Sequence, residues 1–519
     1  MFANLLDRLG NWNPQLFREL KGRLNRRHVY STIVISAILQ FLIVAANSDY
    51  VCVSRFDVGA SGCREGYWSI EWTTIVQAIA WIFPIALISI GVYQLVADFT
   101  KEESRGTLNF IRLSPRSSQT ILNGKLLGVP SLMYFGTLLV FPLFVVAAIG
   151  GGVPLTWVLG FTTLMGAGCY LIYTSALLNT LLAQTAYLAI ASSFLGLWLG
   201  SFYINAILSF FDFRKLIYRQ LDWQWFSFDL GHQPLLAFLW AIVTVGVANY
   251  WVWQALNRRF RNPHATLLNK QQSYGLVGSF QVWLLGLTWP ALAEMGANWT
   301  PDVLSLMAVV STINLVLFLA VIAGISPGRQ ALFDWARYVK DTGGSLDGGD
   351  RPVSKWHELV WGEKSPALVA IALNLAIFAA IWTVAVSMSG VEVTAKLQAI
   401  AGLGTSVVLI WIYAAIAQIA LLIKSSKAGH WALGTVATAI LLPPTLLGLL
   451  FGSVSTQPHT LWMTSVFGSY WLILQEASIA SIVSGFVAQL AIALSLHFTL
   501  SRQLNRAGVS ESKPLLTGK

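Results

Sequence analysis

Apolar runs of about 20 residues recur along the whole chain and dominate its pattern. An α-helix rises roughly 1.5 Å per residue, so a run of this length crosses a hydrocarbon layer about 30 Å thick. We therefore predict an all-α fold, a polytopic transmembrane bundle of about twelve helices. The predicted spans cover residues 30–48, 74–97, 126–150, 155–183, 185–210, 234–256, 277–296, 303–325, 367–389, 397–423, 431–453 and 477–500.

Composition supports the same fold class. Of the 519 residues, 55% are hydrophobic and 11% are charged, about half the charged share of a soluble domain. The first span follows a basic segment of nearly 30 residues and lacks the small-residue cleavage site of a secretory signal. We therefore expect that span to stay in the mature protein, and the chain to be an integral, multi-pass membrane protein.

The distribution of Lys and Arg predicts the orientation, because these residues are retained on the cytoplasmic side. With the N-terminus inside, 27 of the 33 Lys and Arg residues lie in inner segments. Both termini are then cytoplasmic, and the net charge of +10 reflects the topology. No basic face of a folded domain is visible in the sequence, so nucleic acid is not an expected partner.

Internal repetition divides the spans into two sets of six, each of which enters and leaves on the inner side. Short sequence echoes recur at an offset of about 250 residues and indicate a parallel duplication. They are Asn13-Pro14 with Asn262-Pro263, Ser114-Pro115 with Ser365-Pro366, and Leu122-Asn123 with Leu373-Asn374. The predicted organisation is an amphipathic elbow helix (1–29), a six-span unit (30–256), a cytoplasmic connector (257–276), a second six-span unit (277–500) and a disordered cytoplasmic tail (501–519).

Each half places its main inner loop between its second and third spans. The first loop has an acidic start, a short amphipathic stretch at 108–113 and a basic restart, which predicts a short helix across the cytoplasmic face. The second loop has two short amphipathic pieces around a Gly- and Asp-rich centre, 341–352, which is predicted to be flexible. Interfacial helices that lie on lipid headgroups are an alternative interpretation of both loops.

The elbow helix, the six-span unit and above all the segment TKEESRGTLNFIRLSPRSSQTILNGKLL resemble the permease subunits of type-2 ATP-binding-cassette exporters. In that family the loop after the second span carries acidic residues, then Gly-Thr-Leu, then Ser-Pro, then Gly-Lys-Leu at the next helix. The matching positions are Glu102, Glu103, Gly106, Thr107, Leu108, Ser114, Pro115, Gly124, Lys125 and Leu126. The second half keeps Ser365 and Pro366 but has no Gly-Thr-Leu, and Glu358, Trp361, Gly362, Glu363 and Lys364 stand in its place.

The resemblance implies that both loops form coupling helices seated on separate ATP-binding-cassette ATPase subunits, in two copies or of two kinds. Those subunits would bind ATP and Mg, and this chain would bind no cofactor. The sequence has no GxxxxGK[ST] phosphate loop, which agrees with an ATPase on another polypeptide. The chain would then be a permease rather than an enzyme, in a bacterial plasma membrane, exporting a hydrophobic or amphipathic substrate.

The same residues disfavour two other functional classes. The central parts of the predicted spans carry no ionisable side chain, which disfavours an ion-coupled secondary transporter. The seven His residues are scattered and no HExxH motif occurs, so no catalytic or metal site is expected and a membrane enzyme is disfavoured. A non-transporting membrane scaffold or assembly factor stays open as an alternative.

The cysteines allow a first prediction. Cys52 and Cys63 share one predicted outer loop, where an oxidising exterior permits a disulfide, whereas Cys169 lies in an apolar span and is expected to be a packing residue. We predict that Cys52 and Cys63 are bonded, so that alkylation shifts their peptide masses only after reduction. Alkylation of both residues without a reductant would contradict the bond.

Overall fold

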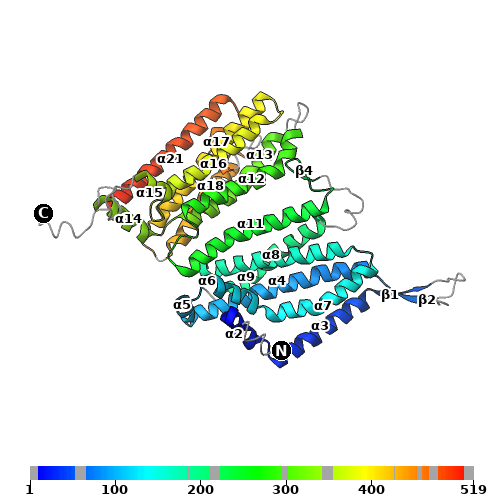
Figure 1. The fold of residues 1–519 in the computed structure, drawn as a ribbon. Helices are drawn as coiled ribbons and strands as arrows, with labels where there is room; N and C mark the ends of the chain where they lie inside the picture. Colours follow the sequence, from blue (N-terminus) through cyan, green and yellow to red (C-terminus); the bar gives the residue numbers. More distant parts are fainter. Residues whose placement is uncertain are drawn as a thin grey trace. The chain divides into compact units, whose positions relative to one another are not determined.

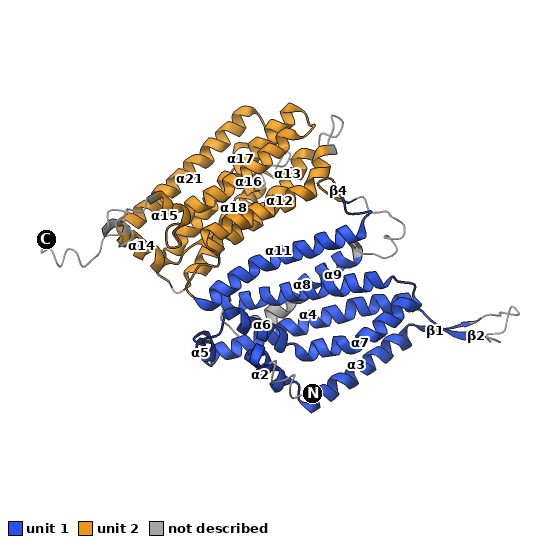
Figure 2. Ribbon diagram, viewed as in Figure 1, with its two compact units in different colours: residues 1–223, 229–263 blue, residues 224–228, 264–519 orange. Residues whose placement is uncertain are grey.

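The computed structural model describes residues 10–52, 66–183, 187–210, 223–294, 302–341, 355–425, 427–452, 459–466 and 477–507. The chain divides into two compact units (Figures 1 and 2). Unit 1 consists of residues 1–223 and 229–263, and unit 2 of residues 224–228 and 264–519.

Unit 1 is a bundle of long helices around α4 (Figure 1). Its helices are α2 (Pro14–Arg23), α3 (Arg26–Ala46), α4 (Trp72–Ser104), α5 (Thr107–Arg112), α6 (Ser118–Gly128), α7 (Ser131–Gly150), α8 (Leu155–Ala183), α9 (Tyr187–Phe210) and α11 (Pro234–Arg261). α4 packs against α7, α8 and α9, while α8 also packs against α11 and α3 lies mainly against α7. Two antiparallel strands, β1 (Ser48–Cys52) and β2 (Gly66–Ile70), lie between α3 and α4 in the chain. A second pair, β3 (Gln224–Trp225) and β4 (Phe228–Asp229), precedes α11 in the chain, and β3 belongs to unit 2.

Unit 2 is a second helical bundle, and α17 is its centre. Its helices are α12 (Lys270–Glu294), α13 (Asp302–Ile325), α14 (Arg329–Asp341), α15 (Lys355–Trp361), α16 (Leu368–Met388), α17 (Val393–Leu421), α18 (Ala428–Phe451), α19 (His459–Trp462) and α21 (Ile479–Ala507). α17 packs against α13, α16, α18 and α21, and α12 packs against α16.

Among the described residues, eleven helices are long and apolar enough to cross a membrane. They confirm an all-α, multi-pass helical fold. The fifth predicted span corresponds to α9, where only the shorter apolar stretch Trp198–Leu208 is found within the described part of the chain. Twelve spans, and the cytoplasmic position of both termini, therefore stay predictions.

The ends of several helices differ from the predicted spans. α4 continues beyond residue 97 to Ser104, because charged residues that lie outside the hydrocarbon are still good helix formers. The predicted third span, 126–150, is wrong at its start. Its residues belong to two helices, α6 and α7, separated at Pro130, which lacks a backbone N–H and so interrupts helical hydrogen bonding. α5, α14 and α15 are short helices at the positions predicted for the two loops. The predicted flexible centre, 341–352, lies almost entirely outside the described residues.

Tyrosines seated on glycines join the helices of unit 1. The Tyr173 hydroxyl on α8 donates to the Leu87 carbonyl of α4 at 2.6 Å, directly over Gly91, where a Cβ would lie 2.0 Å from that hydroxyl. The same arrangement recurs between α9 and α8. There the hydroxyl of Tyr203 donates to the Leu164 carbonyl at 2.7 Å, over Gly168. In both cases the glycine lies four residues after the accepting carbonyl, so one helical turn receives both the ring and its hydrogen bond. Small residues allow this close approach of helices, and interhelical hydrogen bonds stabilise it in a membrane.

Buried polar side chains join helices of unit 2 in a similar way. Gln281 of α12 donates to Asn314 of α13 at 2.6 Å and accepts from the indole of Trp382 on α16 at 2.8 Å. Asn374 of α16 donates to the Ser273 hydroxyl of α12 at 2.9 Å. All five side chains are fully buried, so these hydrogen bonds between neutral groups join α12 to α13 and α16 inside the bundle. In unit 1, Cys169 is also buried, as expected of a packing residue.

The tyrosine seats can be tested on one helix. We expect Gly168→Ala to destabilise the protein by about 1–3 kcal/mol, because the added methyl group overlaps the Tyr203 ring. Gly166→Ala is the matched control, since nothing lies within 4 Å of a Cβ at that position on the same helix. The control should leave stability unchanged or raise it slightly, because alanine favours a helix. Thermal unfolding in detergent measures the stability of both variants. Equal midpoints would contradict the close packing of the Tyr203 ring on Gly168.

Candidate functional site

The elbow helix α2 is docked against α6 through two glycines. Asn13 caps α2 by accepting from the Leu16 amide at 3.1 Å, and its Nδ2 donates to the Thr120 carbonyl of α6 at 2.8 Å. A Cβ on Gly124 would lie 2.8 Å from Asn13 Oδ1, and one on Gly128 would lie 2.5 Å from a side-chain carbon of α2. The helices touch because both positions lack a side chain.

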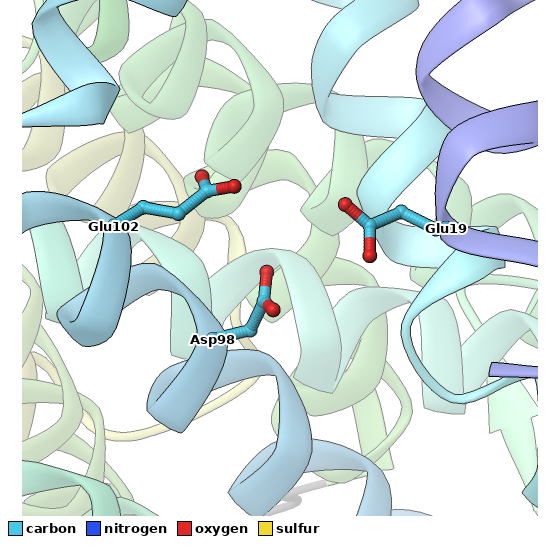
Figure 3. A group of neighbouring side chains, drawn as sticks. All are labelled: Glu19, Asp98 and Glu102. Carbon is cyan, nitrogen blue, oxygen red and sulfur yellow. The ribbon is translucent and has the colours of Figure 1, made fainter. Parts of the chain in front are cut away.

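A buried lysine lies among three carboxylates beside this contact. Lys125 of α6 is fully buried, and its Nζ is 2.5 Å from Asp98 Oδ2, 2.9 Å from Glu102 Oε2 and 3.6 Å from Glu19 Oε1. Asp98 and Glu102 lie on α4, Glu19 lies on α2, and the three carboxylates point toward one another (Figure 3). The ammonium also lies 5.2 Å from the centre of the Phe99 ring. Side chains from α2, α4 and α6 therefore meet at one ammonium group.

Two arginines of α2 complete what we call the Lys125 cluster: Glu19, Asp98, Glu102, Lys125, Arg18 and Arg23. Arg23 Nη2 is 2.9 Å from Asp98 Oδ1, and Arg18 Nη2 is 3.0 Å from Glu102 Oε1. Three cations thus balance three carboxylates. The carboxylates lie close enough together to hold a metal ion, but the Lys125 ammonium takes the central position. Removing one member of a buried ion pair leaves an uncompensated charge, so the cluster fixes the three helices in one arrangement.

The first inner loop presents two large apolar side chains outward. Gly106 reverses the chain between α4 and α5 with φ of +71°, a conformation that glycine adopts without a Cβ penalty. Leu108 is buried in the core of the unit, whereas Phe110 and Leu113, three residues apart, are 80% and 85% exposed. An exposed apolar pair on a loop at the polar end of a bundle is typical of a protein contact surface.

The other predicted residues of the first loop take different roles. Glu102 points into the Lys125 cluster, and its carbonyl accepts from the Thr107 hydroxyl at 3.0 Å. Ser114 follows α5, donating its amide to the Ile111 carbonyl at 3.1 Å, and Pro115 is exposed. Glu103 is half-buried beside α5. The two adjacent glutamates therefore differ in their contacts, because Glu102 is ion-paired within the Lys125 cluster and Glu103 is not a member of it.

The loop is also attached to α11. The guanidinium of Arg112 lies 5.7 Å from the centre of the Phe260 ring, and Ser118 is hydrogen-bonded to Asn257 and to Arg261 of α11. Burial lowers the pKa of Arg112 from its ordinary value, and the nearby Glu103 carboxylate opposes that shift. α5 is thus held between the ends of α4, α6 and α11.

A second buried lysine holds the second inner loop. Lys270, the first residue of α12, is buried and donates from Nζ to the Leu359 carbonyl at 2.7 Å, the Ser365 hydroxyl at 2.6 Å and the Pro366 carbonyl at 3.2 Å. Ser365 Oγ in turn lies 2.7 Å from the Glu358 carbonyl. All three protons of the ammonium are therefore satisfied by α15 and by the segment that joins it to α16, which brings Glu358, Ser365 and Pro366 together.

The surface of the second loop is aromatic. The Glu358 carboxylate accepts from the Trp335 indole at 3.1 Å, which joins α15 to α14. Trp361 packs edge-on against Tyr274 and is 41% exposed. The two predicted residues that follow are exposed, namely Glu363 and Lys364.

The sequence pattern found the loops but missed most of their anchors. Glu19, Asp98 and Lys270 were not singled out, although Glu19 is the single acidic residue within α2 and Lys270 is the single basic residue within α12. The signal in the sequence that could have indicated Glu19 and Lys270 was a single acidic or basic residue in a helix with no other residue of that charge. For the predicted disulfide, Cys63 lies outside the described residues, so its bond to Cys52 stays a prediction.

Comparison with known proteins adds no relative: no family model, curated protein or solved structure matches this chain.

The Lys125 cluster yields a stability prediction. Lys125→Met is expected to cost about 3–5 kcal/mol of unfolding free energy, because it leaves three carboxylates facing one another. Arg18→Gln, which removes a cation whose side chain is 54% exposed, is the control and should cost at most about 1 kcal/mol. Thermal unfolding of the detergent-solubilised protein distinguishes them. A Lys125→Met variant as stable as Arg18→Gln would contradict the stabilising role of the Lys125 cluster.

Proposed function

We propose that this chain is the membrane-spanning permease subunit of an ATP-binding-cassette exporter, placed in a bacterial plasma membrane. The observation that carries the proposal is the exposed pair Phe110 and Leu113 on a short helix outside the apolar spans, anchored from beneath by Leu108. A helix of this kind can seat its apolar side chains in a cleft of a cytoplasmic ATPase. The phosphate loop missing from the sequence is then supplied by that partner, together with ATP and Mg.

The anchoring of the first loop supports a role in transmitting force. α5 follows α4 after a single turn, and α4 is one helix of 33 residues, about 50 Å long. The Lys125 cluster ties the inner end of α4 to α2 and α6. A displacement of α5 by a closing ATPase would therefore move α2, α4 and α6 together rather than bend the loop alone.

The second half is proposed to be a duplicate of the first, with its own coupling loop. Equivalent helices make the same contacts in the two units. In unit 1, α3 packs on α7, α4 on α8, and α8 on α11. In unit 2, the equivalent contacts join α12 to α16, α13 to α17, and α17 to α21. The anchors are also related, since in both units a buried lysine joins the inner end of the bundle to the loop. The units differ at two contacts of α4: it packs extensively on α7 and on α9, and no contacts of similar extent join α13 to α16 or to α18 within the described residues.

The polar interior of unit 2 favours this proposal over an ion-coupled carrier. The buried contacts of Gln281 are with neutral partners, Asn314 and Trp382. Carriers that bind a coupling ion usually use ionisable groups at this depth. The hydrophobic or amphipathic nature of the substrate is part of the proposal and rests on the apolar, aromatic composition of the spans.

The test is co-purification of an ATPase in mild detergent. We expect a polypeptide with a phosphate loop to be recovered with the intact chain, and Phe110→Ala/Leu113→Ala to reduce its recovery at least tenfold, since apolar anchors dominate such contacts. Glu102→Lys is a poor test, because it would disturb the Lys125 cluster directly.

Leu138→Ala/Leu159→Ala is the matched control. Both leucines are strongly exposed but lie on spans α7 and α8, so the control should keep the ATPase. Repeated purification without an ATPase would favour a membrane scaffold or assembly factor. Ion-driven uptake into vesicles that contain this chain alone would overturn the proposal.

A further inference from the structure

α3 is a helix whose apolar side chains are mostly uncovered by protein. It contacts mainly α7, and the side chains of Tyr30, Val34 and Phe41 are 67%, 55% and 71% exposed. These side chains are stable only in contact with lipid. The hydrocarbon layer therefore begins near Tyr30, and the residues just before it lie at the level of the lipid headgroups.

Basic residues occupy that level. Lys21, Arg26, Arg27 and His28 are exposed, and no ion pair to them is found among the described residues. The acidic residue of this region, Glu19, is held in the Lys125 cluster and so does not offset their charge.

The helices α2 and α3 meet at an angle, as Figure 1 shows, and only the short connection between Arg23 and Arg26 separates them. The exposed apolar side chain of Leu24 lies at the bend, and the exposed aromatic side chain of Tyr30 lies in the first turns of α3. Such side chains favour the membrane–water interface. The bend thus combines positive charge, interfacial aromatic groups and an apolar helix that can lie along an acyl chain.

We propose that the elbow between α2 and α3 binds anionic phospholipid, with Arg26, Arg27 and Lys21 on the headgroup phosphate and the acyl chains along the exposed face of α3. The Lys125 cluster uses some of the basic residues near the elbow and leaves others without an ion pair within the described part of the chain. Arg18 and Arg23 are neutralised by carboxylates, whereas the cations that follow are left for an external anion. Lys270 lies 249 residues after Lys21, which is the offset of the Asn-Pro echo, and it is buried and fully hydrogen-bonded. The second half therefore presents no exposed cation at the position equivalent to Lys21.

The experiment titrates the full-length protein in detergent with phosphatidylglycerol or phosphatidylcholine of the same acyl chains, and counts bound lipid by native mass spectrometry. Wild type is expected to bind phosphatidylglycerol at lower concentration than phosphatidylcholine. Each basic residue near an anionic headgroup contributes about fivefold in affinity, so Arg26→Gln/Arg27→Gln should weaken phosphatidylglycerol binding about 30-fold. Arg26→Lys/Arg27→Lys keeps the charge and should retain the preference.

Lys424→Gln/Lys427→Gln is the matched control. It removes the same charge from exposed residues just before α18, another helix with little protein around it, but no elbow helix precedes that position. The control should bind phosphatidylglycerol like wild type. Equal weakening by both double variants would mean general attraction to basic residues and overturn the site, as would an unchanged Arg26→Gln/Arg27→Gln. If that variant does not fold, the single variants Arg26→Gln and Arg27→Gln replace it, and unchanged affinity in both would equally overturn the proposal.

Discussion

The pairing of Lys125 with the carboxylates of Asp98, Glu102 and Glu19 is the interaction on which the inner end of unit 1 depends. A fully buried ammonium is stable only if its charge and its protons are satisfied. That requirement brings α2 against α6 and fixes the end of α4, which in turn positions α5 and its exposed apolar pair. The surface proposed to meet an ATPase is thus supported by a charge balance that lies beneath it.

Away from the Lys125 cluster, the long helices are held together by close packing and by hydrogen bonds between helices. In lipid, two apolar helices gain little from the hydrophobic effect by associating, so close packing and polar contacts decide which faces meet. Tyr173 over Gly91 and Tyr203 over Gly168 supply both at once. Unit 2 uses side-chain amides instead, through Gln281 and its partners.

The fold class was predictable because one physical quantity, the length of an apolar run, determines it. The site was predictable only in part. Gly106 was identifiable from a motif, and the structure shows it in a left-handed turn that suits glycine. The partners of Lys125 could not be derived, because they come from helices distant in sequence, and a charged residue next to a span looks the same whether it faces water or a carboxylate. Likewise, the repeated Ser-Pro pair did not indicate that its two copies differ in burial. Ser365 and Pro366 are buried, and Ser365 accepts from Lys270, whereas Pro115 is exposed.

The docking of α2 on α6 also has a consequence for inheritance. The residues that must change together are spread over positions 14–128, from the elbow through α4 to the glycines of α6. Loss of the cation at 125 is tolerable only with loss of a carboxylate at 19, 98 or 102, so substitutions at these four positions are expected to be correlated among related chains. The same segment would have to be exchanged as one piece in a chimera, because an elbow helix taken from another protein would bring the wrong charges to a buried lysine.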